Sequence, residues 1–142
     1  MRTIMSNPGP RIIATVLCAM AAQAHAAGGV VVIGNANLAG LDASTLEKVY
    51  TGKVIEVGGV SVTAVNANSG SAVRTRFLKA YLNQDDDKYT AYWVVRRCIG
   101  KGVSPRELPS SAAIISFVRS TPGAIGYVDE ADLQPDLNVL LK

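Results

Sequence analysis

The sequence has 142 residues, of which 49% are hydrophobic, and a formal net charge of +3. Two of its 14 basic residues, Arg2 and Arg11, lie in the leader described below, whereas all 11 acidic residues follow it. Residues 27–142 therefore carry 12 basic and 11 acidic residues, a net charge of +1. This near balance excludes the broad basic surface of a nucleic-acid-binding protein, so we expect no nucleic-acid partner.

Residues 1–26 have the pattern of a secretory signal peptide. A positively charged start precedes the apolar run IIATVLCAMAA at residues 12–22, and an A-x-A cleavage site follows at residues 24–26. The run is shorter than the roughly 20 residues that a transmembrane helix needs. We expect cleavage before Ala27 and a periplasmic mature protein; the alternative is an uncleaved anchor.

Loss of the leader would also remove histidine and one cysteine from the protein. His25 is the only histidine, and Cys18 is one of two cysteines. Cys98 would then have no internal disulfide partner, and we expect it to be a small buried residue beneath a helix end; the alternative is a reactive or intermolecular thiol. Without histidine, and with no serine–lysine pairing evident, we expect a non-enzymatic protein with no catalytic residues, no metal site and no cofactor.

The first half of the remaining chain predicts strands alternating with helices. The β-branched run at 30–33 predicts a buried strand. Asp42 is typical of a helix start, and Gly52 fits the position that ends that helix. Gly58 and Gly59 predict a tight turn between apolar runs at 54–57 and 60–65. Residues 66–71 are turn-forming.

The second half continues this alternation. A helix is expected with one face made of Val73, Phe77, Ala80 and Tyr81, and it is expected to end at Asn83 and Gln84. Another is expected from the acidic run 85–87, with Tyr89, Tyr92 and Trp93 on its buried side. A loop is expected at 99–105, then a helix begun by Ser110 or Ser111. Thr121-Pro122-Gly123 fits a type II turn before a strand at 124–128, and residues 139–141 fit a last edge strand. These predictions describe one α/β domain over residues 27–142, with a small sheet flanked by helices.

Gly126, inside the strand predicted at 124–128, predicts a close approach at that position. A glycine within a strand is typical where another backbone or a bound group comes near. We therefore expect one of these two against Gly126.

The loop Asn68-Ser69-Gly70-Ser71 is the most suggestive candidate site. It follows an apolar strand and opens a helix, so its backbone N–H groups lack helical partners. Ser69 and Ser71 add hydroxyl donors, Gly70 permits close approach of the backbone, and Arg74 adds a guanidinium that matches phosphate or carboxylate. These features predict anion binding at Ser69, Gly70, Ser71 and Arg74. The alternative is plain helix capping.

Other charged motifs do not predict a site. Gly52-Lys53 and Gly100-Lys101 do not complete the G-x-x-x-x-G-K-[ST] pattern of a nucleotide-binding P-loop. The acidic run Asp85–Asp87 lacks the spacing of a calcium loop, and we expect a solvated helix cap there.

Three segments resemble the phosphate-type substrate-binding proteins of ABC importers, and the likeness runs from about Val31 to Val128. LEKVYTGK at 46–53 is similar to their L-x-x-I-[FY]-x-G-K segment, and TPGAIGYV at 121–128 is similar to their x-P-G-A-I-G-Y-V. Between these lies the Ser69-Gly70-Ser71 loop, where those proteins have their serine- and glycine-bearing anion loop. Tyr92-Trp93 and Gly100-x-Gly102 are similar to small, single-lobe relatives. The resemblance implies one α/β lobe of the periplasmic-binding-protein (type II) kind.

The resemblance also implies a function. We expect an exported solute-binding lobe for phosphate or a similar oxyanion, whose partners would be membrane components of an ABC importer or a second protein lobe. Only Ser69, Gly70 and Ser71 carry over from the family's loop, because the arginine that precedes it falls at Asn66 here. The rival hypothesis is a periplasmic protein-interaction or scaffold module that kept the fold and lost the ligand.

Overall fold

The computed structural model describes residues 29–142, and the predicted signal peptide lies outside them. Within residues 29–142, no helix is both long and apolar enough to cross a membrane. The strands are β1 (Val30–Gly34), β2 (Glu56–Val57), β3 (Val60–Ser61), β4 (Thr63–Ala67), β5 (Arg106–Leu108), β6 (Ala124–Asp129) and β7 (Asn138–Leu141). The helices are α1 (Ala43–Tyr50), α2 (Ala72–Phe77), the π-helical η1 (Leu78–Leu82), α3 (Asp86–Cys98), α4 (Ser111–Ser120) and the 3₁₀ turn η2 (Glu130–Asp132).

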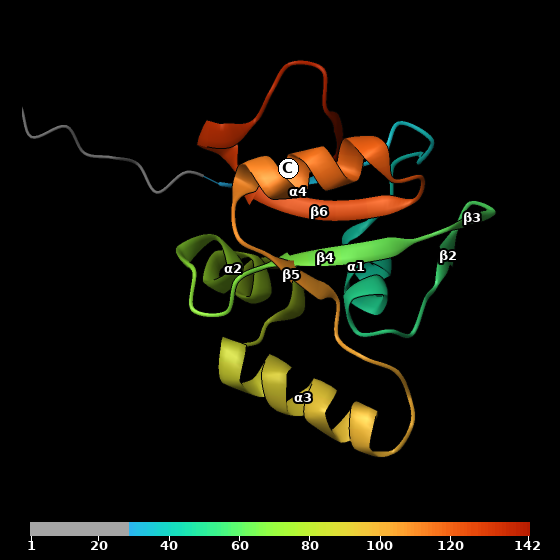
Figure 1. Cartoon of the computed structure of the whole chain (residues 1–142), viewed down its shortest axis with the longest axis vertical. Coiled ribbons are helices and arrows are strands. Elements are labelled where there is room, and N and C mark those ends of the chain that lie inside the picture. Colours follow the sequence, from blue (N-terminus) through green and yellow to red (C-terminus); the bar gives the residue numbers. More distant parts are fainter. Residues whose placement is uncertain (1–28) are drawn as a thin grey trace, which may run out of the picture.

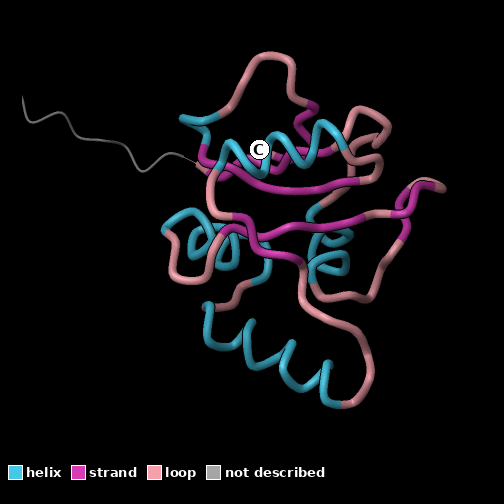
Figure 2. Tube along the Cα trace, viewed as in Figure 1, coloured by secondary structure: helices cyan, strands magenta, loops and turns pink. Residues whose placement is uncertain are grey.

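Five strands form one mixed sheet in the order β5-β4-β6-β1-β7 (Figures 1 and 2). β4 is parallel to β5 and to β6, whereas β1 is antiparallel to β6 and to β7. β2 and β3 form a separate hairpin. This arrangement confirms the predicted α/β class, with a small sheet flanked by helices.

The core occupies both faces of the sheet, and β6 shows the division. Gly126 faces α4, where an added Cβ would lie 2.6 Å from the Ile114 side chain. The next residue, Tyr127, faces the other side, where its ring stacks on Phe77 with centroids 3.8 Å apart. Consecutive strand residues point to opposite faces, so α4 covers one face while α1, α2 and η1 cover the other. The expectation of a backbone or ligand against Gly126 was wrong, because a side chain fills that space.

Helix α3 lies away from the sheet, at the bottom of Figure 1. Long aromatic side chains connect it to the end of α1. The Tyr89 hydroxyl donates to the Tyr50 carbonyl at 2.9 Å, and the Tyr92 hydroxyl donates to the Thr51 carbonyl at 2.7 Å. Tyr89 and Trp93 are buried, whereas Tyr92 is half-buried. Cys98, at the last turn, is exposed, so its predicted burial was wrong.

Most of the predicted elements are confirmed, including the caps. Asp42, Ser71, Asp85 and Ser110 each accept a backbone N–H at a helix start. The differences lie in two strands and one helix, since the helix expected to carry Val73 and Tyr81 continues after Phe77 as the π-helical η1. The predicted strand at 60–65 divides between the hairpin and the main sheet, because Val62 separates β3 from β4. The short strand β5 was not predicted; it pairs in parallel with β4, and its apolar residue Leu108 is buried.

Candidate functional site

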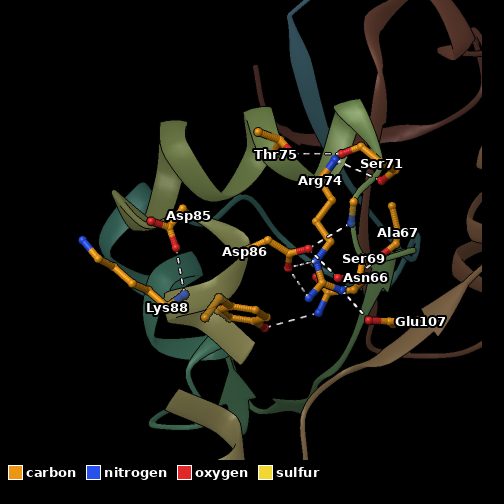
Figure 3. A network of polar contacts seen from close by, with 12 residues as sticks. Asn66, Ala67, Ser69, Ser71, Arg74, Thr75, Asp85, Asp86, Lys88 and Glu107 are labelled. Atoms are coloured by element: carbon orange, nitrogen blue, oxygen red, sulfur yellow. Dashed lines mark hydrogen bonds and ion pairs between the residues drawn. The ribbon is translucent and has the colours of Figure 1, made fainter. Parts of the chain in front are cut away.

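The loop of residues 68–71, here called the Ser69 loop, leaves the end of β4 and opens α2 (Figure 3). Gly70 has φ +80°, and no atom lies within 4 Å of the position of an added Cβ. Ser69 and Gly70 are exposed. The Ser71 hydroxyl accepts the Arg74 backbone N–H at 3.4 Å, so it caps the helix. The loop therefore presents two outward donors, the Ser69 hydroxyl and the Gly70 N–H.

Both donors bind the carboxylate of Asp86, from the first turn of α3. The Ser69 hydroxyl and the Gly70 N–H donate to Asp86 Oδ2, the latter at 2.9 Å. Arg74 Nε donates to Asp86 Oδ1 at 2.8 Å. The donors predicted to bind an external anion thus converge on a carboxylate of the chain itself (Figure 3).

Arg74 lies beneath this contact and is only 3% exposed. Its guanidinium also pairs with Glu107 of β5 at 2.6 Å and donates to the Ala67 carbonyl at 3.2 Å. The Tyr89 ring lies against it, with the guanidinium carbon 5.5 Å from the ring centroid. Buried charges need partners of this kind, because an uncompensated charge in a protein interior is costly.

The electrostatics of the cluster favour an ionised Asp86. Partial burial opposes its ionisation, but hydrogen bonds from Ser69 and Gly70 and the charge of Arg74 outweigh this effect, so the pKa of Asp86 lies below its ordinary value. Arg74 supplies one positive charge, whereas Asp86 and Glu107 supply two negative charges, for a net charge of −1. The positive charge of Arg74 is therefore already exceeded by the negative charge of its two partners.

Two further carboxylates lie near the same end of the sheet. Asp129, at the end of β6, pairs with Arg76 of α2. Asp132 of η2 accepts the hydroxyl of Ser111, the first residue of α4, at 2.8 Å. Internal carboxylates therefore also engage a second arginine and a second serine at a helix start.

Asn66, at the position where the resemblance places the family's arginine, faces the core. It is 1% exposed. Its side chain accepts the Tyr127 hydroxyl at 3.1 Å and donates to the Tyr89 hydroxyl at 3.3 Å. These bonds place Asn66 in a buried tyrosine network rather than among the donors of the Ser69 loop.

Sequence reasoning brought Ser69, Gly70 and Arg74 together and missed their partners. The run Asp85–Asp87 was interpreted as a solvated cap, but only Asp85 accepts the capping N–H, that of Lys88 at 2.8 Å. The one available signal was Arg74 itself, because an arginine that becomes buried needs carboxylate partners. It could not identify Asp86 and Glu107, which are 12 and 33 residues from Arg74 in sequence.

Comparisons with known proteins support the fold alone. No protein-family model matches the chain, and no curated protein matches it. Among solved structures, it resembles an ABC-type phosphate transport receptor from Vibrio cholerae, with 15% identity, a TM-score of 0.54, and 80% of this chain and 45% of the receptor covered. A candidate phosphate ABC transporter substrate-binding protein from Clostridium perfringens, with bound phosphate, matches at 19% identity and a TM-score of 0.56, covering 80% and 44%.

PstS from Borrelia burgdorferi is a third similar structure, with 16% identity and a TM-score of 0.59, covering 80% of this chain and 47% of PstS. The chain thus spans less than half of each of these proteins. The five-stranded mixed sheet and its helices have the fold of a single lobe of a phosphate-type substrate-binding protein.

Proposed function

We propose that the chain is an exported, non-enzymatic binding lobe that acts by engaging a protein partner. We further propose that it does not capture free phosphate while Asp86 is bound to the Ser69 loop. The observation that carries this proposal is the Asp86 carboxylate on the donors of the Ser69 loop. Phosphate would have to displace this carboxylate or bring further negative charge to a cluster whose net charge is already −1. Like charges at short range disfavour the second case.

The outward face of α3 supports a protein partner. Val95 and Ile99 are 59% and 62% exposed. Scattered exposed apolar residues are ordinary, but these two lie one turn apart at the end of α3 and its C-cap, beside the exposed Cys98. Binding of a partner over this face would remove their apolar surface from water, which is favourable.

Crosslinking from Cys98 tests the proposal. Cys98 is the only cysteine outside the predicted leader, so a thiol-reactive photo-crosslinker can be attached there alone. Irradiation of the purified, labelled protein in an extract of the cells that make it should give a discrete adduct larger than the chain. Val95→Asp and Ile99→Asp should abolish this adduct, whereas Val139→Asp, at a 40% exposed position on β7, should preserve it. No adduct, or equal loss in all three variants, would contradict a partner on α3.

Oxyanion binding is the second candidate, favoured by the three donors that converge on Asp86. Calorimetric titration with phosphate, with sulfate as a control anion, separates the two. We expect no saturable heat of phosphate binding from the unmodified chain. We expect weak phosphate binding after Asp86→Ala, because the donors freed from Asp86 could then bind an anion. Millimolar or tighter phosphate binding by the unmodified chain, about −4 kcal/mol or better, would instead establish the second candidate.

A further inference from the structure

An apolar cleft of about 190 Å³ lies where the end of α1, the β2–β3 hairpin, α3 and the segment before β5 meet. Every residue that lines it is apolar or glycine. These residues include Val49, Val54, Ile55, Trp93, Val103 and Pro105. No residue of the cluster formed by Arg74, Asp86 and Glu107 lines it, so the cleft is separate from the candidate site.

The two most exposed large apolar side chains within residues 29–142 both line this cleft. Ile55 and Val103 are 77% and 72% exposed, and they belong to different segments of the chain. Single exposed apolar residues are ordinary on a protein surface. Two that meet on one concave apolar surface are instead typical of a place where another molecule binds.

The guanidinium of Arg96, from α3, lies at the border of the cleft. A Cβ added to the lining residue Gly52 would lie 2.8 Å from Trp93 Cη2 and 3.3 Å from Arg96 Nη2. The guanidinium carbon is 5.5 Å from the ring centroids of Tyr92 and Trp93. Nη2 donates to the carbonyl oxygens of Gly52 and Lys101 at 3.4 and 3.2 Å, which fixes the group in this place.

Arg96 has no carboxylate partner in the part of the chain that the structure describes. There, Arg74, Arg76 and Arg119 each pair with a carboxylate, whereas Arg96 forms no ion pair. Its Nε is buried and has no hydrogen-bond partner among residues 29–142. A half-buried guanidinium without a counterion has lost part of its hydration, so a carboxylate brought by another molecule would bind it favourably.

Further cations surround the cleft. Among the residues adjacent in sequence to those that line it, three are basic and only Glu56 is acidic. The basic ones are Lys48, Lys53 and Arg106. Lys101 lies beside Arg96, because its N–H donates to the Arg96 carbonyl at 2.8 Å. None of these four basic residues forms an ion pair within residues 29–142, so the apolar surface has a positively charged border.

We propose that this cleft binds an acidic peptide segment of a partner protein. One branched apolar side chain of that segment packs against Trp93 and Val103, and a neighbouring carboxylate pairs with Arg96. Because the cations belong to several segments of the chain, several carboxylates along one peptide complement them better than one small anion does. This inference goes beyond the proposed function, since neither Val95 nor Ile99 lines the cleft.

A model peptide tests the site. Trp93 is the only tryptophan and lines the cleft, so its fluorescence reports on binding. Titration of the purified chain with acetyl-Glu-Glu-Leu-Glu-Glu-amide at low ionic strength should give a saturable change, paralleled in calorimetry. Replacing the leucine by serine, or the glutamates by lysines, should weaken binding about tenfold or more. Added salt should also weaken it, because salt screens exposed charges.

Matched variants locate the peptide. Arg96→Gln should weaken the leucine peptide about tenfold. Lys79→Gln, which removes the same charge from an exposed position of η1 outside the cleft, should not. Val103→Ser should weaken binding by a similar factor, whereas Val139→Ser, at a 40% exposed position on β7, should preserve it. Because Val103 is 72% exposed, its substitution tests the site even if Arg96→Gln impairs folding.

Four results would overturn this site. The first is the absence of saturation by both methods, up to about 5 mM peptide, in a folded sample. The second is equal binding of the leucine and serine peptides. The third is an equal effect of Val103→Ser and Val139→Ser. The fourth is binding to vesicles of phosphatidylethanolamine and phosphatidylglycerol without binding of the peptide, which would identify a membrane surface instead. A failed crosslink from Cys98 would leave the peptide result unaffected, so the two failures are distinguishable.

Discussion

Arg74→Ala should lower the free energy of unfolding by about 3 kcal/mol, because it leaves two carboxylates without their shared buried cation. Arg74 is 3% exposed and holds Asp86, Glu107 and the Ala67 carbonyl together. The Asp86 and Glu107 side chains are 20% and 46% exposed, so they stay partly solvated. The expected loss of stability therefore lies at the lower end of the range for breaking a buried ion pair. Urea denaturation followed by circular dichroism measures it.

Arg76→Ala is the matched control for Arg74→Ala. Arg76 pairs with Asp129, but its side chain is 33% exposed. Ion pairs with this degree of exposure contribute about 0–1 kcal/mol. A loss for Arg74→Ala no greater than that for Arg76→Ala would mean that the cluster does not organise this end of the sheet.

Gly123→Ala should be at least as destabilising, by about 3 kcal/mol or more, since backbone strain and a steric clash add. Gly123 has φ +75°, and an added Cβ would lie 1.9 Å from the Ser61 carbonyl oxygen. The same glycine accepts the Thr63 N–H at 2.9 Å, so the clash must shift the start of β4. Thermal or urea unfolding measures the loss.

Gly70→Ala separates the two contributions. Gly70 has nearly the same backbone angle, φ +80°, but open space around its Cβ position. Its substitution should cost only the strain of the left-handed conformation, about 1–2 kcal/mol. Equal losses for Gly70→Ala and Gly123→Ala would contradict the close packing of Gly123 on the β2–β3 hairpin.

Local signals in the sequence accounted for most of the fold. The cap residues Asp42, Asp85 and Ser110 predicted helix starts because their side chains accept backbone N–H groups that would otherwise lack partners. Thr121-Pro122-Gly123 predicted its turn because the third position requires positive φ, and Gly123 has φ +75°. Such signals act within a few residues, so they can be recognised without knowing what lies beyond them.

Features that depend on distant residues escaped prediction. The strand β5 has three residues and one buried apolar side chain, too short a pattern to show alternation. Cys98 was expected to be buried beneath a helix end, but the buried side of α3 consists of Tyr89 and Trp93, and Cys98 is exposed. The occupant of the Ser69 loop depends on where α3 docks, and tertiary packing alone determines that.

The most direct test of the central claim follows the Gly70 amide by NMR, since this N–H should donate to Asp86 and not to an external anion. The pKa of Asp86 is lowered by folding, so its contribution to stability is present above the ordinary value near 3.9 and is lost as the pH falls through the lower folded value. The Gly70 amide resonance should move with this acid titration and should not move when phosphate is added at neutral pH. A Gly70 amide resonance that does not change with the acid titration and shifts saturably with phosphate would contradict the account and identify an open oxyanion site.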